Sequence, residues 1–189
     1  LPNEIPQMSV GLLLDESGSM CSCDRCTYAR SSAIILYDFC KALHIPVTVY
    51  GHSTSGNSVE LYSYAEFESI DNDDKYRMMD IAARGSNRDG AALRFVAEQL
   101  VKRPEEVKIL ILVSDGQPAA PGYYGSAAEE DLRGIKQEYR RKGVLFIAAA
   151  IGEDKQNIER IYGDSFMDIT DLNQLPVKLT AAVKRHMRV

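Results

Sequence analysis

One stretch decides the fold of this chain: Val10-Gly11-Leu12-Leu13-Leu14-Asp15-Glu16-Ser17-Gly18-Ser19. An apolar run of this length that ends in an acidic residue predicts a buried parallel strand whose carboxyl end opens into a loop. Ligands of open α/β sheets bind at that end of the strands. Asp15, Ser17 and Ser19 stand at alternate positions, so one carboxylate and two hydroxyls can point at a common centre. These hard oxygens suit Mg2+, Mn2+ or Ca2+, although a capped turn that leads into a helix explains the same residues.

The composition is that of one globular domain. The 189 residues are 45% hydrophobic and 26% charged, which is ordinary for a soluble protein with a buried core. The net charge of -5 comes without a dense basic stripe, so nucleic acid is not an expected partner. The longest apolar runs, near 109–113 and 144–151, are too short to cross a bilayer. Because the chain starts at Leu1 without an initiator methionine, we expect 1–189 to be a single domain cut from a longer polypeptide.

Apolar strands alternate with amphipathic helices along the chain. We expect strands at 10–14, 47–51, 59–64, 107–113, 144–151 and 166–169. We expect helices near 25–43 (with Asp24 as N-cap), 71–83, 91–101, 128–139, 158–162 and 175–187, the last with an apolar face of Leu175, Leu179, Ala182 and Met187. The sequence therefore predicts a doubly wound α/β fold: a mostly parallel six-stranded sheet with one antiparallel edge strand and helices on both faces.

Three of the predicted loops carry acidic or amide oxygens at the carboxyl edge of this sheet. They are Asp15-Glu16-Ser17-Gly18-Ser19, Asn87-Arg88-Asp89-Gly90 and Ser114-Asp115-Gly116. In order and approximate spacing they resemble the three loops of the metal-ion-dependent adhesion site (MIDAS) of von Willebrand factor type A (VWA) domains, and the resemblance covers essentially the whole chain. Together with the segments 103–110 and 114–118, the second loop looks most like the C-terminal domain of a cobaltochelatase subunit. Nitric oxide reductase activation proteins are close relatives.

The resemblance implies a set of metal ligands. It places Asp15, Ser17 and Ser19 at the ion, and Asp115 near it, directly or through water. The neutral hydroxyls would leave Mg2+ under-neutralised, so a carboxylate from a partner could complete its octahedral shell.

The second loop departs from the family pattern. The family usually supplies a threonine hydroxyl here, whereas this chain has Asn87 at that position and Asp89 two residues later. An amide oxygen can coordinate, and Asp89 is either a ligand or an N-cap for the helix that follows. A directly bound Asp89 would add negative charge and weaken the pull on a partner's carboxylate.

These residues favour a metal-dependent protein-interaction module over an enzyme, because no loop offers a nucleophile beside a general base. The resemblance implies a MoxR-type AAA+ ATPase as partner, and a role in the maturation or activation of a metalloenzyme in the cytoplasm. The alternative from another class is a phosphohydrolase of the haloacid dehalogenase type. Such enzymes have Asp-x-Asp at the strand end, where this chain has Ser17, and no lysine stands in an obviously corresponding loop. A nucleotide-binding Gly-x-x-x-x-Gly-Lys-Ser/Thr loop is also absent from the sequence.

The cysteines offer a third possibility, a zinc or redox module. Cys21, Cys23 and Cys26 are close in sequence, but a helix puts Cys40 about 20 Å from Cys26 at 1.5 Å per residue. We expect reduced thiols, as in the cytosol, and Cys40 in the core.

Other polar and aromatic residues carry weaker signals. His44, His52 and His186 show no obvious pairing, although the topology turns His52 toward the functional edge. The loop 118–125, with Tyr123 and Tyr124, is expected to be an exposed, adaptable rim of the metal edge. The alternative is that both tyrosines cover the adjoining helix.

Overall fold

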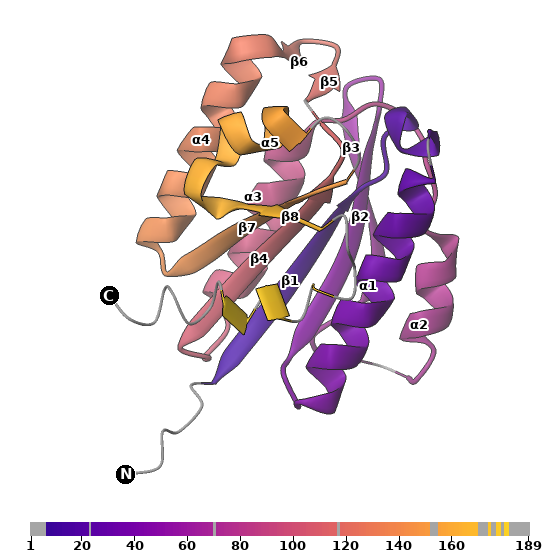
Figure 1. Ribbon diagram of the computed structural model, residues 1–189, viewed down its shortest axis with the longest axis vertical. Helices are drawn as coiled ribbons and strands as arrows, with labels where there is room; N and C mark the ends of the chain where they lie inside the picture. The colour runs from indigo at the N-terminus through magenta and orange to yellow at the C-terminus, as the bar shows by residue number, and fades with distance from the viewer. Residues whose placement is uncertain are drawn as a thin grey trace.

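The computed structural model describes residues 7–22, 24–69, 71–116, 118–151, 155–169, 174, 177–178 and 180–181. Six strands form one sheet: β1 (Met8–Asp15), β2 (Val47–Ser55), β3 (Ser58–Ala65), β4 (Val107–Ser114), β7 (Val144–Ala150) and β8 (Phe166–Asp168). Their order is β3-β2-β1-β4-β7-β8 (Figure 1). β3 pairs antiparallel with β2, and the other four pairs are parallel. The predicted mixed sheet with one antiparallel edge is confirmed.

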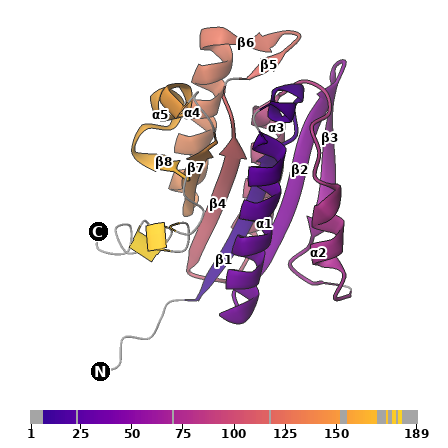
Figure 2. The same cartoon turned by 45° about the vertical axis from the view of Figure 1, so that its right-hand side comes forward.

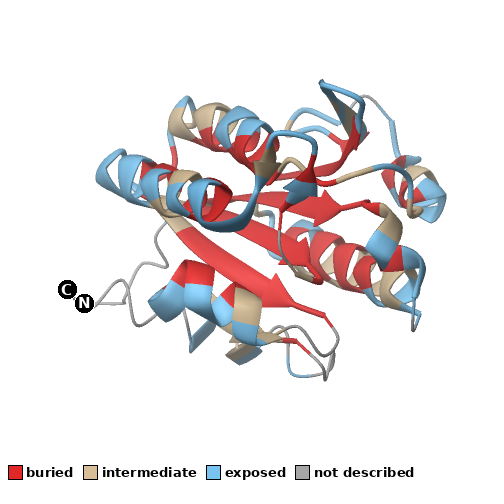
Figure 3. Cartoon of the chain, turned by 90° about the horizontal axis from the view of Figure 1, so that it is seen from above, coloured by how far each residue is buried: buried red, intermediate tan, exposed pale blue. Residues whose placement is uncertain are grey.

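Helices cover both faces of the sheet (Figures 1 and 2). One face carries α1 (Arg25–Ala42) and the short α2 (Asp74–Arg77), and the other carries α3 (Asp89–Val101), α4 (Gly125–Arg141) and α5 (Lys155–Tyr162). Because side chains alternate along a strand, β1 feeds both cores: Leu12 and Leu14 pack with α1, and Leu13 packs with α3. All three leucines have 0% exposure, and each buried leucine contributes about 1.5–3 kcal/mol. Seen from above, the buried strands lie between two layers of helices (Figure 3).

The expected helix at 71–83 is shorter than predicted. The Asp71 carboxylate accepts a 2.9 Å hydrogen bond from the backbone N–H of Asp73, a local turn that delays the first helical residue to Asp74. A 3-10 turn, η2 (Met78–Asp80), follows α2, and Ile81 then leaves the helical conformation at φ -57° and ψ 119°.

Three other expectations need correction. β2 does not end at Gly51 but continues to Ser55, because residues 52–55 pair antiparallel with residues 58–61 of β3. Asp24 precedes α1 in a left-handed conformation, φ 57°, and its side chain makes no capping hydrogen bond. The predicted loop 119–125 contains a small hairpin, β5 (Ala119–Ala120) and β6 (Tyr123–Tyr124), because these short segments pair antiparallel. The apolar positions of the expected last helix lie outside the described residues.

Candidate metal centre

The three predicted loops meet at the carboxyl edge of the sheet, where backbone hydrogen bonds tie them together. The first loop donates from Gly18 N–H to the carbonyl of Gly85 (2.7 Å) and accepts from Arg84 N–H at the carbonyl of Glu16 (2.7 Å). The second loop accepts at the carbonyl of Asn87 from the N–H of residue 119, at 3.1 Å. The edge is therefore a connected frame rather than three separate loops.

Asp15 lies at the centre of this frame. Its side chain is 1% exposed and accepts three hydrogen bonds: from Ser17 N–H (2.8 Å), Asn87 Nδ2 (2.8 Å) and Ser114 Oγ (2.9 Å). Ser114 ends β4, next to β1 in the sheet, and sequence analysis did not name it as a site residue. The amide of Asn87 donates through its nitrogen, so its oxygen is left buried without a partner in the structure. Donors from all three loops, Ser17, Asn87 and Ser114, thus converge on the Asp15 carboxylate.

A chain of three oxygens runs from the first loop to the third. Ser17 Oγ lies 3.0 Å from Ser19 Oγ, and Ser19 Oγ donates to Asp115 Oδ1 at 3.1 Å. Hydrogen bonds set these separations in the structure, and they hold the three oxygens close enough to be neighbouring ligands of one cation.

Asp115 has a cationic partner that sequence analysis missed. Arg25, the first residue of α1, places Nη1 2.6 Å from Asp115 Oδ2, and the two side chains are 14% and 4% exposed. Burial raises the pKa of Asp115 above its usual value and the charge of Asp15 raises it further, whereas the contacts with Ser19 and Arg25 oppose the rise.

Asp89 is the first residue of α3 and lies inside the site. Arg88 holds the N-cap position, and no side chain makes a capping hydrogen bond there, so the N-cap interpretation of Asp89 is wrong. Asp89 Oδ1 lies 3.2 Å from Nε2 of His52, which is the distance of an ion pair when the imidazole is protonated. His52 is 0% exposed and stands beside Asp15 in the sheet register. Burial lowers the pKa of His52, but Asp89, Asp15 and Glu16 outweigh it, and the pKa lies above its ordinary value.

The charges of these groups do not balance. With their carboxylates ionised, Asp15, Asp89 and Asp115 contribute three negative charges and Arg25 contributes one positive charge, which leaves two negative charges with His52 neutral and one with His52 protonated. Burial raises the pKa of Asp15 above its usual value, and the charge of Asp89 raises it further. Buried charges are costly unless they are paired or coordinate a metal. A bound divalent cation would offset this excess of negative charge.

The donor set fits such a cation. Asn87 Oδ1 is a buried acceptor without a hydrogen-bond partner, and Asp89 Oδ1 has only the 3.2 Å contact with His52 among the described residues; the hydroxyls of Ser17 and Ser19 add two further oxygens at this edge. Within the described residues, no three acidic, histidine or cysteine side chains are arranged as a metal cluster. A metal at this edge would therefore depend on hydroxyl and amide oxygens as well as on carboxylates.

Glu16, in the first loop, holds this loop to the segment that precedes the second loop. It is 0% exposed and accepts hydrogen bonds from Tyr64 Oη (2.7 Å), Arg84 Nε (2.8 Å) and the N–H of Ala82 (3.3 Å). Glu16 stands at the unspecified position between Asp15 and Ser17 of the Asp-x-Ser-x-Ser motif, so the motif does not predict this role. The carboxylate anchors the segment that leads into the second loop.

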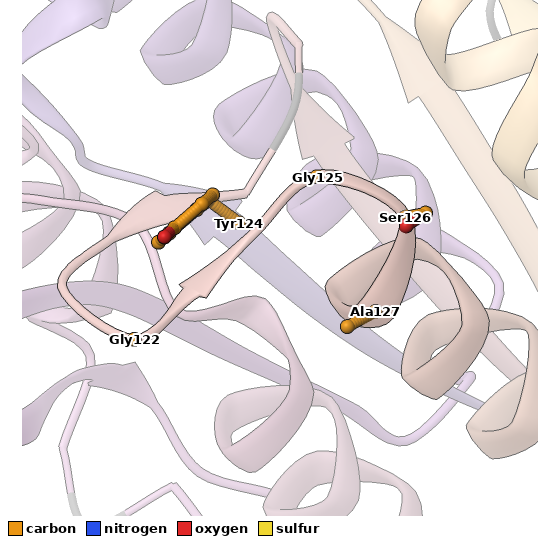
Figure 4. Close-up of a pocket in the computed structure, with 5 residues that line it drawn as sticks. All are labelled: Gly122, Tyr124, Gly125, Ser126 and Ala127. Carbon is orange, nitrogen blue, oxygen red and sulfur yellow. The ribbon is translucent and has the colours of Figure 1, made fainter.

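The rim next to the third loop differs from the expected adaptable loop. Tyr123 is half-buried and donates to Asp131 Oδ2 at 2.7 Å, and Arg88 Nη2 donates to the carbonyl of Pro121 at 2.5 Å. Tyr124 is 69% exposed beside a shallow hollow of about 410 Å³ (Figure 4). The hollow is lined by Gly122, Tyr124, Gly125, Ser126 and Ala127. One tyrosine therefore holds the hairpin to α4, and the other is available on the surface.

The cysteines that the structure describes do not form a cluster with other metal ligands. Cys21 is exposed, Cys26 is half-buried and Cys40 is fully buried, and all three are free thiols. Burial raises the pKa of Cys40 to about 12. The predicted core position of Cys40 is confirmed, and Cys23 lies outside the described residues.

Comparison with known proteins identifies the family. The model of the cobalamin biosynthesis protein CobT VWA domain matches residues 74–187. The chain belongs to the CobT VWA domain family. The match includes the second and third loops of the site. The first loop precedes it in the chain.

Relatives and solved structures agree with this assignment. The CobT-family chain is 26% identical over 188 residues to the uncharacterized protein YojO of Bacillus subtilis (strain 168), an alignment that covers 92% of this chain and 29% of YojO. It is 34% identical over 97 residues to protein NorD of Brucella suis biovar 1 (strain 1330), covering 50% of this chain and 15% of NorD. The chain therefore spans less than a third of either relative. The vWF domain of the type V pili tip protein Mfa5 from Porphyromonas gingivalis shares the fold, with a TM-score of 0.67, 11% identity, and coverage of 97% of this chain and 96% of that one.

Among the described residues, no helix combines the length and apolar character needed to span a membrane.

Proposed function

We propose that this CobT-family VWA domain is a metal-dependent protein-interaction module. A divalent cation, Mg2+ or else Mn2+ or Ca2+, would be held by Asp15, Ser17, Ser19 and Asp115, with Asn87 or Asp89 from the second loop. The bound ion would act as a Lewis acid that receives a carboxylate of a partner protein. The observation that carries this proposal is the gathering of three buried carboxylates at this edge of the sheet, those of Asp15, Asp89 and Asp115, whose negative charges when ionised exceed the positive charge of Arg25 whether or not His52 is protonated.

The partner and pathway rest on the family. The matching family model is described as a cobalamin biosynthesis protein domain, and protein NorD is among the relatives. The resemblance to cobaltochelatase subunits and nitric oxide reductase activation proteins favours a MoxR-type AAA+ ATPase as partner, in the maturation or activation of a metalloenzyme. The exposed Tyr124 beside the third loop supplies contact area next to the metal edge. A cytoplasmic setting is part of the proposal and agrees with the free thiols of the described cysteines.

Thermal melting with and without Mg2+ tests the metal site. A cation at 100 times its Kd adds about 2.7 kcal/mol to the free energy of unfolding, and this raises the Tm of a domain of this size by about 5 to 10 °C. Asp15→Asn keeps the shape of the side chain and should abolish the shift, and Ser17→Ala should reduce it. Ser22→Ala, at an exposed serine nearby, is the matched control and should keep the full shift. An equal shift in wild type and Asp15→Asn would contradict the site.

The partner is tested by a pull-down against the candidate ATPase. Binding should be lost with a chelator and in Asp15→Asn, and it should persist in Ser22→Ala. Binding that survives both the chelator and the substitution would show that the ATPase uses another surface.

The absence of catalysis is a separate expectation. Ser17 and Ser19 are hydrogen-bonded to one another, Ser19 donates to Asp115, and Ser114 donates to Asp15, so the hydroxyls of these three serines are engaged with oxygens rather than with a general base. We therefore expect no release of phosphate from generic phosphoesters in the presence of Mg2+. Metal-dependent turnover that disappears in Asp15→Asn would favour the phosphohydrolase alternative instead.

A further inference from the structure

Arg25 places a guanidinium at the edge of the candidate metal site. Nη1 lies 2.6 Å from Asp115 Oδ2, while Oδ1 of the same carboxylate accepts from Ser19. Arg25 and Asp115 are 90 positions apart in the chain, so the contact joins the start of α1 to the loop after β4. The sequence motif of the site includes no cation at this position.

The charge of Arg25 changes what the loaded site can bind. Asp15, Asp89 and Asp115 carry three negative charges, and a divalent cation would offset two of them. With His52 neutral, the loaded site without Arg25 would keep one negative charge and repel an incoming carboxylate. With Arg25 it becomes neutral, or positive if His52 is protonated. The extra carboxylate of Asp89, which would weaken an adhesion-type site, is thereby compensated.

We propose that Arg25 determines the specificity of the site for acidic partners: it offsets the charge of Asp89 so that the loaded site accepts a carboxylate, and it weakens metal binding in return. This inference rests on the proposed function. It differs from a purely structural role because it predicts opposite effects on two ligands. A guanidinium that only held Asp115 in place would strengthen the binding of both.

The experiment compares Arg25→Gln, Arg25→Lys and the wild type with Mn2+ and acetate as probes. Mn2+ affinity is measured by electron paramagnetic resonance, and acetate binding by the relaxation of water protons on the Mn2+-loaded protein. Removing one positive charge near the ion should raise Mn2+ affinity by about three- to tenfold and lower acetate affinity by about the same factor. Arg25→Lys keeps the charge and should stay within about threefold of wild type for both ligands, given the weaker geometric match of lysine.

Two controls keep the result interpretable. Arg30→Gln removes a positive charge from α1 whose Nη2 donates to the carbonyl of Ile81 instead, and it should leave both affinities unchanged. Arg25→Met is a second neutral variant in case Arg25→Gln does not fold, as judged by circular dichroism. Loss of both affinities in a folded neutral variant, or unchanged acetate binding, would contradict the proposed role of Arg25. Neither result would contradict the proposed metal site of the wild type. Failure of the wild type to bind Mn2+ would overturn the proposed function and this inference with it.

Discussion

Replacing Gly51 with alanine should dislodge the carboxylate under the first metal loop. A Cβ atom at this position would lie 1.6 Å from Oε1 of Glu16, far inside van der Waals contact. If the Glu16 carboxylate moved away from Gly51, it would lose its hydrogen bonds to Tyr64, Arg84 and the N–H of Ala82. The added methyl group and the Glu16 carboxylate therefore compete for one volume, and we expect the carboxylate to be expelled.

The cost follows from the burial of these groups. Breaking a buried ion pair costs about 3–5 kcal/mol. Arg84 is 36% exposed and can regain water, so the lower end applies, about 3 kcal/mol. For a domain of this size that is a fall in Tm of about 6 to 12 °C. Glu16→Ala deletes the same carboxylate and should cost a similar amount.

The double variant separates this mechanism from two independent defects. Once Glu16→Ala has removed the obstructing atoms, Gly51→Ala has nothing left to expel. The double variant should then cost about 3 kcal/mol rather than about 6, a coupling at the upper end for residues in contact. The measurement is urea denaturation at 25 °C followed by circular dichroism, with the free energy of unfolding and the m-value obtained for each protein.

Glu68→Ala is the matched control. Its carboxylate pairs with Arg103 but is 83% exposed, and so its removal should cost less than about 1 kcal/mol. Additive costs in the double variant, or a Gly51→Ala protein that unfolds at the urea concentration of wild type, would contradict the close approach of Glu16 and Gly51.

Three further outcomes are expected. Gly90→Ala should destabilise the protein by about 1–3 kcal/mol in urea denaturation, because its Cβ would lie 2.5 Å from the hydroxyl oxygen of Tyr123; an unchanged free energy would contradict this packing. The thiol of Cys40, with its pKa raised to about 12, should stay unlabelled by a disulfide reagent at pH 8 in the native protein, whereas exposed Cys21 reacts; rapid labelling of both would argue against the burial. Tyr124→Ala should change stability by less than about 0.5 kcal/mol yet weaken capture of the ATPase, and equal capture would remove this tyrosine from the interface.

The strand-end positions of the site were predictable from the sequence, because parallel strands bring their carboxyl ends to one edge. Asp15 and Asp115 each follow an apolar run, Asn87 precedes a helix and Asp89 begins it, so topology alone gathers them. Whether they bind metal stays a prediction, since side-chain proximity is all that the fold supplies.

The partners of these residues were not predictable in the same way. Arg25 and Asp115 are joined across 90 positions, and no local pattern reports such a pair. His52 lies in a polar run that hides the continuation of β2, since buried His52 and Thr54 break the apolar pattern of a core strand. Glu16 falls on a variable position of the motif, where its burial depends on a glycine in the neighbouring strand.

The backbone bonds between the loops bear on how fast the edge of the sheet can open. The N–H of Thr54 donates to the carbonyl of Ser86 (2.8 Å), and the N–H of Ser86 donates to the carbonyl of Thr54 (2.9 Å). The N–H of Gly18 donates to the carbonyl of Gly85, the residue before Ser86. These amides should exchange with deuterated solvent in a cooperative unit with the strands, on the slow timescale of the core, rather than at the rate of exposed loops. A ligand that arrives here meets a frame whose backbone is already ordered, so association need not wait for a loop to close.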